Sequence, residues 1–172
     1  MTDAAFGEDV AAVAVGANLG DRAGTIAEAI RRMGRLGMVE AVSSLIETPA
    51  WPDPAAAPPY LNGAVLLRTG LDAHALLRGL LEIEATLGRE RPYVNAPRTI
   101  DLDLLLHGSR VIVSPDLILP HPRMHQRAFV LLPLAEIAPE MVHPVWGRRV
   151  SGFAAAQGGV ESSDACLPGS NE

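Results

Sequence analysis

Strand-like and helix-like segments follow one another along this chain in an order that few folds permit. The four strand-like and two helical runs cover, in chain order, residues 10–15 (strand), 21–37 (helix), 39–47 and 60–69 (strands), 72–88 (helix) and 99–107 (strand). This order is that of the split β-α-β arrangement. We therefore expect an α+β fold, a ferredoxin-like α/β sandwich whose antiparallel sheet carries helices packed on one face.

Length and cysteine content indicate one domain in a reducing compartment. At 172 residues the chain suits a single domain, which we place at residues 1–156. Residues 157–172, rich in Gly, Ser and acidic residues, are predicted to form a flexible C-terminal tail. Cys166 is the only cysteine, so the chain has no disulfide framework. The first apolar run is far shorter than the ~20 residues of a membrane span, and we expect a cytoplasmic protein with no membrane partner.

The charge is distributed unevenly along the chain. The chain as a whole carries a net charge of −6, which argues against a nucleic-acid partner. Between residues 89 and 127, however, six arginines stand against four acidic residues, a local surplus of +2. A basic segment in an acidic protein is typical of a site for a small anionic ligand rather than for a long polyanion.

Two carboxylates interrupt the apolar run of the strand predicted at residues 99–107. Side chains alternate along a strand, so Asp101 and Asp103 share one face, whereas Ile100, Leu102 and Leu104 share the other. Carboxylates about 7 Å apart repel one another unless a cation lies beside them. Mg²⁺ typically takes one or two carboxylates together with phosphate oxygens. From the motif alone, a wet acidic face explains the pair equally well. The nearby arginines favour a metal-assisted phosphoryl-transfer site.

The common nucleotide-binding loops are excluded. The turn GANLGD, at residues 16–21, joins a strand to a helix, where backbone N–H groups can face an anion, but a tight structural turn explains it as well. The chain has no lysine, so it lacks the Gly-Lys-Ser/Thr ending of a phosphate-binding loop.

Residues 48–59 contain five prolines and are predicted to form a long irregular loop.

Residues 96–105, APRTIDLDLL, closely resemble the signature of the 6-hydroxymethyl-7,8-dihydropterin pyrophosphokinase family of folate biosynthesis. Further matches occur in the expected order within residues 10–145, at Gly16-x-Asn18-Leu19-Gly20, Ser43-Ser44, Thr48-Pro49, Tyr60-Leu61-Asn62, Pro120-His121-Pro122-Arg123, Arg127-x-Phe129 and Pro133-Leu134-x-Glu136-Ile137-Ala138-Pro139. A set of motifs in the expected order identifies a family far more specifically than any single motif does. The resemblance implies transfer of a pyrophosphoryl group from ATP to the hydroxymethyl group of a dihydropterin, with release of AMP.

The resemblance also implies roles at the phosphate end of the site. Asp101 and Asp103 are expected to hold two Mg²⁺ ions along the triphosphate of ATP. Four basic side chains match family positions near the phosphates: Arg89, Arg98, His121 and Arg127. Of these, Arg89 and Arg98 are grouped with the two aspartates as catalytic. A guanidinium suits this task because its planar fork grips phosphate and stays charged. No general base is identified, and whether Asp101 also contacts the hydroxymethyl group stays open.

The dihydropterin is expected at a second group of matches. Tyr60 and Asn62 share one strand face, and an Asn amide offers a donor and an acceptor to the lactam edge of a pterin. By the resemblance, Asn62 binds this edge, and Thr48 adds contacts at the same end. Tyr60 and Phe129 would sandwich the ring. Plain core packing is the competing interpretation for these two aromatic residues.

Two alternatives differ in function from this expectation. The first is a non-catalytic ligand-binding module on the same ferredoxin-like fold, in which the aspartates form only an acidic edge. The second is a different D-x-D, Mg²⁺-dependent transferase that uses a sugar nucleotide. Under the leading hypothesis the chain acts as a monomer, and its partners are the small molecules ATP and dihydropterin.

Overall fold

The computed structural model describes residues 6–50, 53–55, 57–88 and 100–165, with the backbone alone for 158–165. Its elements are, in chain order, β1 (Val10–Ala17), α1 (Arg22–Met33), β2 (Met38–Val42), β3 (Ile46–Thr48), β4 (Tyr60–Arg68), α2 (Ala73–Leu87), β5 (Asp101–His107), β6 (Ile112–Val113), β7 (Ile118–Leu119), the 3₁₀ turn η1 (Met124–Gln126), α3 (Ala128–Ile137) and α4 (Val150–Ala165). Within these ranges no helix is long and apolar enough to cross a bilayer.

The main sheet is antiparallel throughout, as predicted. Its central strands β1 and β4 pair from Val10 opposite Arg68 to Ala17 opposite Leu61. The order across the sheet is β2-β4-β1-β5, and the short strand β3 pairs with the part of β4 that β2 does not reach. The run predicted as one strand at 39–47 is therefore two strands, because the chain turns a corner at Ser44. That corner is held by Glu136 of α3, whose Oε1 accepts hydrogen bonds from the Ser44 N–H (3.0 Å) and Oγ (2.8 Å).

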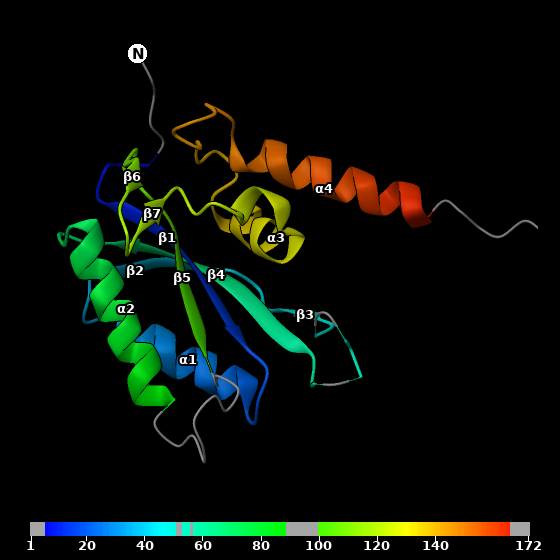
Figure 1. Ribbon diagram of the computed structural model, residues 1–172, viewed down its shortest axis with the longest axis horizontal. Coiled ribbons are helices and arrows are strands. Elements are labelled where there is room, and N and C mark those ends of the chain that lie inside the picture. Colours follow the sequence, from blue (N-terminus) through cyan, green and yellow to red (C-terminus); the bar gives the residue numbers. More distant parts are fainter. Residues whose placement is uncertain (1–5, 51–52, 56, 89–99, 166–172) are drawn as a thin grey trace, which may run out of the picture.

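Helices cover both faces of the sheet (Figure 1). The helices α1 and α2 pack on one face over a core that includes Val13, Ile26 and Leu76. The helix α3 and the first turns of α4 pack on the opposite face, where the core includes Leu131 and Phe153. The prediction that helices lie on one face only is therefore wrong. The sequence of α3, AFVLLPLAEI, is almost entirely apolar and so lacks the one-sided periodicity that signals an amphipathic helix.

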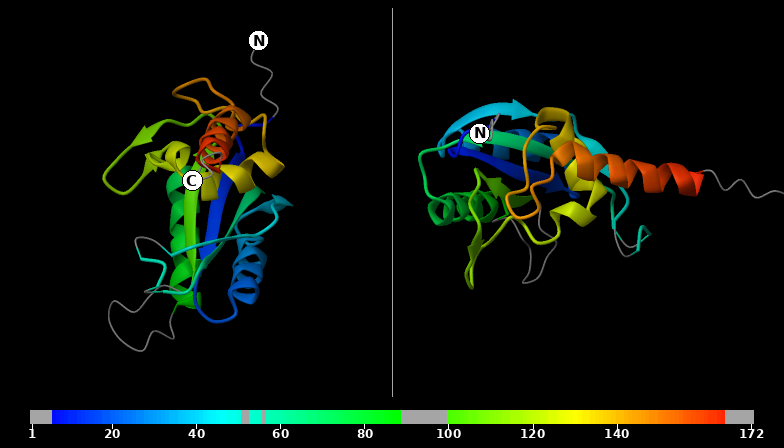
Figure 2. Two further views of the ribbon diagram at one scale, coloured as in Figure 1. Left: turned by 90° about the vertical axis from the view of Figure 1, so that its right-hand side faces the viewer. Right: turned by 90° about the horizontal axis from the view of Figure 1, so that it is seen from above.

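Two further segments follow the main sheet. The chain turns after β5, with the Arg110 N–H donating to the His107 carbonyl, and β6 then pairs with β7 in a separate two-stranded sheet. Helix α4 continues to Ala165, into the range predicted as a tail, and it projects past the sheet (Figure 2). Its first turns are anchored by buried Val150 and Phe153, and a helix once started extends cheaply. Residues 166–172 of the predicted tail lie outside the described residues.

His107, at the end of β5, is a buried and unpaired titratable group. Its side chain is fully buried, and neither ring nitrogen has a hydrogen-bond partner in the part of the chain that the structure describes. Burial, together with the positive charge of Arg110, lowers the pKa of the imidazole from 6.5 to about 4. The ring is therefore neutral in the folded protein at pH 7.

We expect acid to destabilise the fold through His107. Between pH 6.5 and about 4 the unfolded chain binds a proton on this ring and the folded chain does not, so the free energy of unfolding falls as the pH falls. The effect is at most roughly 3 kcal/mol. Urea unfolding of the wild type and His107→Leu at pH 7 and pH 4.5 measures it, because the variant should lose less stability on acidification. Equal losses in both proteins would contradict the assignment.

Candidate active site

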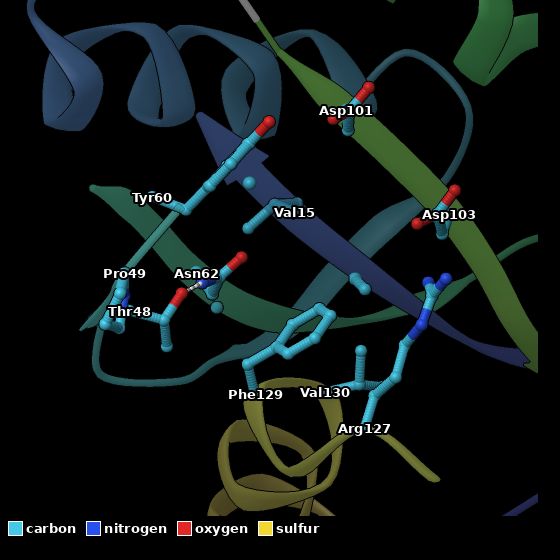
Figure 3. A pocket seen from close by; sticks show the side chains of 13 residues that line it. Val15, Thr48, Pro49, Tyr60, Asn62, Asp101, Asp103, Arg127, Phe129 and Val130 are labelled. Atoms are coloured by element: carbon cyan, nitrogen blue, oxygen red, sulfur yellow. Dashed lines mark hydrogen bonds between the residues drawn. The ribbon is translucent and has the colours of Figure 1, made fainter. Parts of the chain in front are cut away.

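A cavity of about 470 Å³ opens between the sheet and the start of α3 (Figure 3). It is lined by Ala14, Val15, Gly16, Thr48, Pro49, Tyr60, Asn62, Gly63, Asp101, Asp103, Arg127, Phe129 and Val130. Seven of the ten site residues predicted from the sequence are on this list, although they come from β3, β4, β5 and the start of α3. Arg89 and Arg98, also predicted for the site, lie outside the described residues.

The two aspartates stand on one face of β5, as strand alternation predicts. In the register of β5 with β1, Asp101 lies opposite Gly16 and Asp103 lies opposite Ala14. Both side chains are partly exposed at the cavity, whereas Ile100, the residue before β5, is buried in the core on the other face. The carboxylates therefore stand on a strand that is anchored from behind by apolar packing.

Glu84 of α2 supports this part of β5 from the far face of the sheet. Its carboxylate is buried, and Oε1 accepts a hydrogen bond of 2.6 Å from the backbone N–H of Leu102, the residue between the two aspartates. Because β5 is an edge strand of the sheet, this N–H would otherwise face the protein interior without a strand partner.

Replacing Glu84 with alanine is expected to destabilise the protein by roughly 2–3 kcal/mol, because a buried backbone N–H loses its acceptor and a cavity is left. Glu84→Gln keeps an oxygen acceptor of the same shape and should cost distinctly less. Urea unfolding of the two variants gives both numbers. The contact would be shown to be unimportant if the alanine variant unfolded at the wild-type urea concentration.

Small residues of β1 form the floor between the aspartates and Asn62. Gly16 lies opposite Asn62 on one side and Asp101 on the other, and Ala14 lies one alternation further along. A Cβ at Gly16 would come within 3.0 Å of the Asn62 Oδ1, so a larger side chain here would intrude on the cavity. Sequence reasoning treated Gly16 only as part of a turn. The alternation along β1, combined with its register, is the signal that would have found it.

Asn62 has its side chain fixed by a neighbouring strand. It is 7% exposed, and its Nδ2 donates a 2.7 Å hydrogen bond to the Thr48 Oγ1 on β3. This bond leaves the amide oxygen directed into the cavity (Figure 3). Tyr60, two residues earlier on β4, lines the same end. The cavity thus has one end with an oriented amide and an aromatic ring.

The start of α3 supplies the opposite wall. Phe129 lies in the first turn of this helix and is 38% exposed, although it is a large apolar side chain. The guanidinium carbon of Arg127 lies 5.7 Å from the centre of the Phe129 ring. In Figure 3 the guanidinium extends toward Asp103, on the side of the cavity away from Thr48. The exposed Phe129 ring therefore belongs to the aromatic end of the cavity, and the Arg127 guanidinium belongs to the charged end.

His121 lies beside the charged end without lining the cavity. Its backbone N–H donates to the carbonyl of Leu105 on β5 (2.9 Å), and its Nδ1 accepts a hydrogen bond from the Arg123 N–H (3.1 Å). Burial lowers the pKa of the His121 ring, opposed by the nearby charge of Asp103. The neutral ring carries its proton on Nε2, because Nδ1 acts as an acceptor. The side chain can therefore donate one hydrogen bond from Nε2.

Comparison with known proteins shows which family this chain resembles. The family model for 7,8-dihydro-6-hydroxymethylpterin-pyrophosphokinase (HPPK) matches residues 12–139. A 2-amino-4-hydroxy-6-hydroxymethyldihydropteridine pyrophosphokinase of Synechocystis is 41% identical over 142 residues, which cover 81% of this chain and 72% of that protein. The enzyme of the same name from Bacillus subtilis is 40% identical over 137 residues, 77% of this chain and 80% of that protein.

Longer proteins contain the same unit. The folic acid synthesis protein FOL1 of Dictyostelium discoideum is 34% identical over 80% of this chain, which spans 21% of that protein. The fold also matches a crystal structure of Plasmodium falciparum HPPK-DHPS with a TM-score of 0.71 at 15% identity, over 90% of this chain and 46% of that one. From the matched residues 12–139 and the relatives near 40% identity, we conclude that the chain belongs to the HPPK family.

Proposed function

We propose that the chain transfers a pyrophosphoryl group from ATP to the hydroxymethyl group of 6-hydroxymethyl-7,8-dihydropterin and releases AMP. The observation that carries this proposal is the composition of one cavity: an oriented amide with aromatic rings at one end and a carboxylate pair with an arginine at the other. This is the arrangement required to hold a flat heterocycle next to a polyphosphate. Family membership is consistent with the same reaction in folate biosynthesis.

The aromatic end suits the pterin. A pterin presents a lactam beside an amidine-like edge, and the Asn62 amide offers one acceptor and one remaining donor to such an edge. Its bond to Thr48 fixes this orientation before the ligand arrives, which lowers the entropy lost on binding. Tyr60 and Phe129 provide aromatic surfaces for the ring. A cavity of about 470 Å³ lies in the usual range for small-molecule sites.

The charged end suits the triphosphate. Asp101 and Asp103 offer two carboxylates on one face, and no third acid, histidine or cysteine of the described residues joins them in a metal-holding group. This donor set fits Mg²⁺, which takes one or two carboxylates and completes its shell with water and phosphate oxygens. Two such ions, when bound, would neutralise phosphate charge and orient the triphosphate. We propose the same end for Arg89 and Arg98, on the basis of their sequence positions.

The reaction forms one bond and breaks another at the β-phosphorus of ATP. The hydroxymethyl oxygen attacks this atom and loses its proton, and the bond to the oxygen that bridges the α- and β-phosphates breaks. Negative charge grows on that oxygen as AMP leaves. Arg127 extends toward this end, where its fixed positive charge stabilises the leaving phosphate. The neutral His121 ring can donate from Nε2 to a phosphate oxygen.

Product analysis tests the proposed function. Purified protein is incubated with ATP, Mg²⁺ and 6-hydroxymethyl-7,8-dihydropterin, and the nucleotides and pterins are separated by chromatography. We expect AMP and a pyrophosphorylated pterin in equal amounts. ADP as the nucleotide product would overturn the proposal, and no turnover would favour a non-catalytic binding module. Turnover of a sugar nucleotide in place of ATP would favour a different D-x-D transferase.

We also propose that the chain works as a cytoplasmic monomer without a nucleic-acid or membrane partner. The monomer proposal rests on the cavity, which is lined by residues of a single chain. Light scattering on the purified protein measures its mass in solution. The expected value is 18.2 kDa, and a value of twice this would contradict the proposal.

A further inference from the structure

Arg22, the first residue of α1, joins two segments that are distant in sequence. Its Nη1 donates a 2.9 Å hydrogen bond to the backbone carbonyl of Pro59, and its Nη2 makes a 2.9 Å charged hydrogen bond to the Glu47 Oε2. Pro59 directly precedes Tyr60 and Glu47 directly precedes Thr48. One guanidinium therefore holds both ends of the proline-rich segment 49–59 at the point where β3 and β4 separate.

Strand β3 is held less firmly here than β4, which also pairs with β1 as far as Leu61. Strand β3 contains three residues and, among the described residues, pairs with β4 alone, with Thr48 opposite Tyr60 and Glu47 opposite Leu61. Thr48 is the residue that orients Asn62 through its hydroxyl group. A small shift of β3 relative to β4 would therefore move the hydrogen-bond partner of Asn62 and change the aromatic end of the cavity.

Arg22 acts from outside the cavity. Because side chains alternate along a strand, Glu47 points to the opposite face of β3 from Thr48, the face on which α1 packs. Arg22 does not line the cavity. An arginine suits this contact better than a lysine, since its planar fork reaches two acceptors with two different nitrogens, whereas a lysine ammonium is a single point of charge.

We propose that Arg22 is a positioning residue that sets the affinity for the pterin substrate by fixing β3 and β4 at Thr48 and Tyr60. This inference rests on the proposed function for its kinetic consequence but not for the contact itself. The ion pair is partly solvated, with side-chain exposures of 27% for Arg22 and 56% for Glu47. Such pairs contribute little to global stability. The effect should therefore appear in substrate affinity rather than in unfolding.

Steady-state kinetics of Arg22→Ala test the consequence. We expect KM for the dihydropterin to rise about three- to tenfold, because misplacement far from the reacting atoms weakens a preorganised site. KM for ATP and kcat should stay within about twofold, and Arg22→Lys should restore part of the affinity. Arg31→Ala is the matched control, since Arg31 lies on the same helix and its guanidinium pairs with Glu28 of that helix.

A second variant and a second measurement separate the possible failures. Glu47→Ala removes one arm of the contact and should raise the same KM, and the double variant should be no worse than Arg22→Ala alone, because the two residues act together. Amide hydrogen exchange of Thr48 and Tyr60 should be faster in Arg22→Ala than in wild type, whether or not the protein turns over.

The possible results distinguish a failure of the role proposed for Arg22 from a failure of the proposed function. Unchanged exchange, or an unchanged pterin KM in an active protein, would overturn the role of Arg22. Absence of turnover in the wild type would instead count against the proposed function, and the exchange rates would then decide whether Arg22 fixes the strands. An equal rise of KM in Arg31→Ala would show a general effect of the helix and would also overturn the proposal.

Discussion

Replacing Asp101 or Asp103 with asparagine should lower kcat by about a thousandfold or more while the protein stays folded. Each change keeps the size of the side chain and removes one negative charge from the pair that we propose to hold Mg²⁺. Without the ion, the charge of the triphosphate is not neutralised, and metal stabilisation of this kind is worth several kcal/mol in the transition state. Both aspartates are partly exposed and lie outside the two apolar cores, so stability should change little.

Turnover of the two variants is measured with saturating ATP, pterin and Mg²⁺, and folding is checked by urea unfolding. Glu140→Gln serves as the matched control, because Glu140 is an exposed acid that pairs with Arg149 and does not line the cavity. It should keep wild-type kcat. Near-wild-type activity in either aspartate variant would remove that residue from the metal site.

Asn62→Ala is expected to weaken pterin binding by about 10- to 100-fold. The change removes an amide that is held in place by Thr48 and directed into the cavity. Each hydrogen bond left unmade by a buried ligand group costs about 1–3 kcal/mol, so the loss falls in this range. Calorimetric titration with an oxidised, stable pterin measures the affinity. ATP affinity is the internal control and should stay within about twofold.

Thr48→Val gives a sharper version of the same prediction. Valine keeps the shape of threonine but cannot accept the hydrogen bond from Asn62, so the amide stays present and loses its fixed orientation. Pterin affinity should fall, but by less than in Asn62→Ala. If both variants bound the pterin as tightly as wild type, Asn62 would not contact it.

Local patterns predicted most of the fold. The ends of α2 follow directly from Asp72, whose side chain accepts from the Ala75 N–H, and from Gly88 at the other end. Long-range packing explains the errors. The apolar helix α3 has no polar face to reveal it, and the corner at Ser44 depends on Glu136, a residue 92 positions away.

In the candidate site, too, local features were predictable from the sequence and long-range contacts were not. The alternation that put Asp101 and Asp103 on one face is a local property of a strand, and it is confirmed. Motif matches located the residues of β3, β4 and the start of α3, which the structure brings to the same cavity. The supporting contacts were not visible in the sequence, because Glu84 reaches β5 across 18 residues and Arg22 reaches Pro59 across 37.

Counting bound metal ions tests most directly whether the acidic pair holds the cations beside the nucleotide. Mn²⁺ replaces Mg²⁺ as a paramagnetic probe, and its binding is followed by electron paramagnetic resonance with a non-hydrolysable α,β-methylene analogue of ATP. We expect two Mn²⁺ ions per chain in the wild type and in Glu140→Gln, and fewer than two in Asp103→Asn. Two ions bound with wild-type affinity in Asp103→Asn would contradict the proposed site.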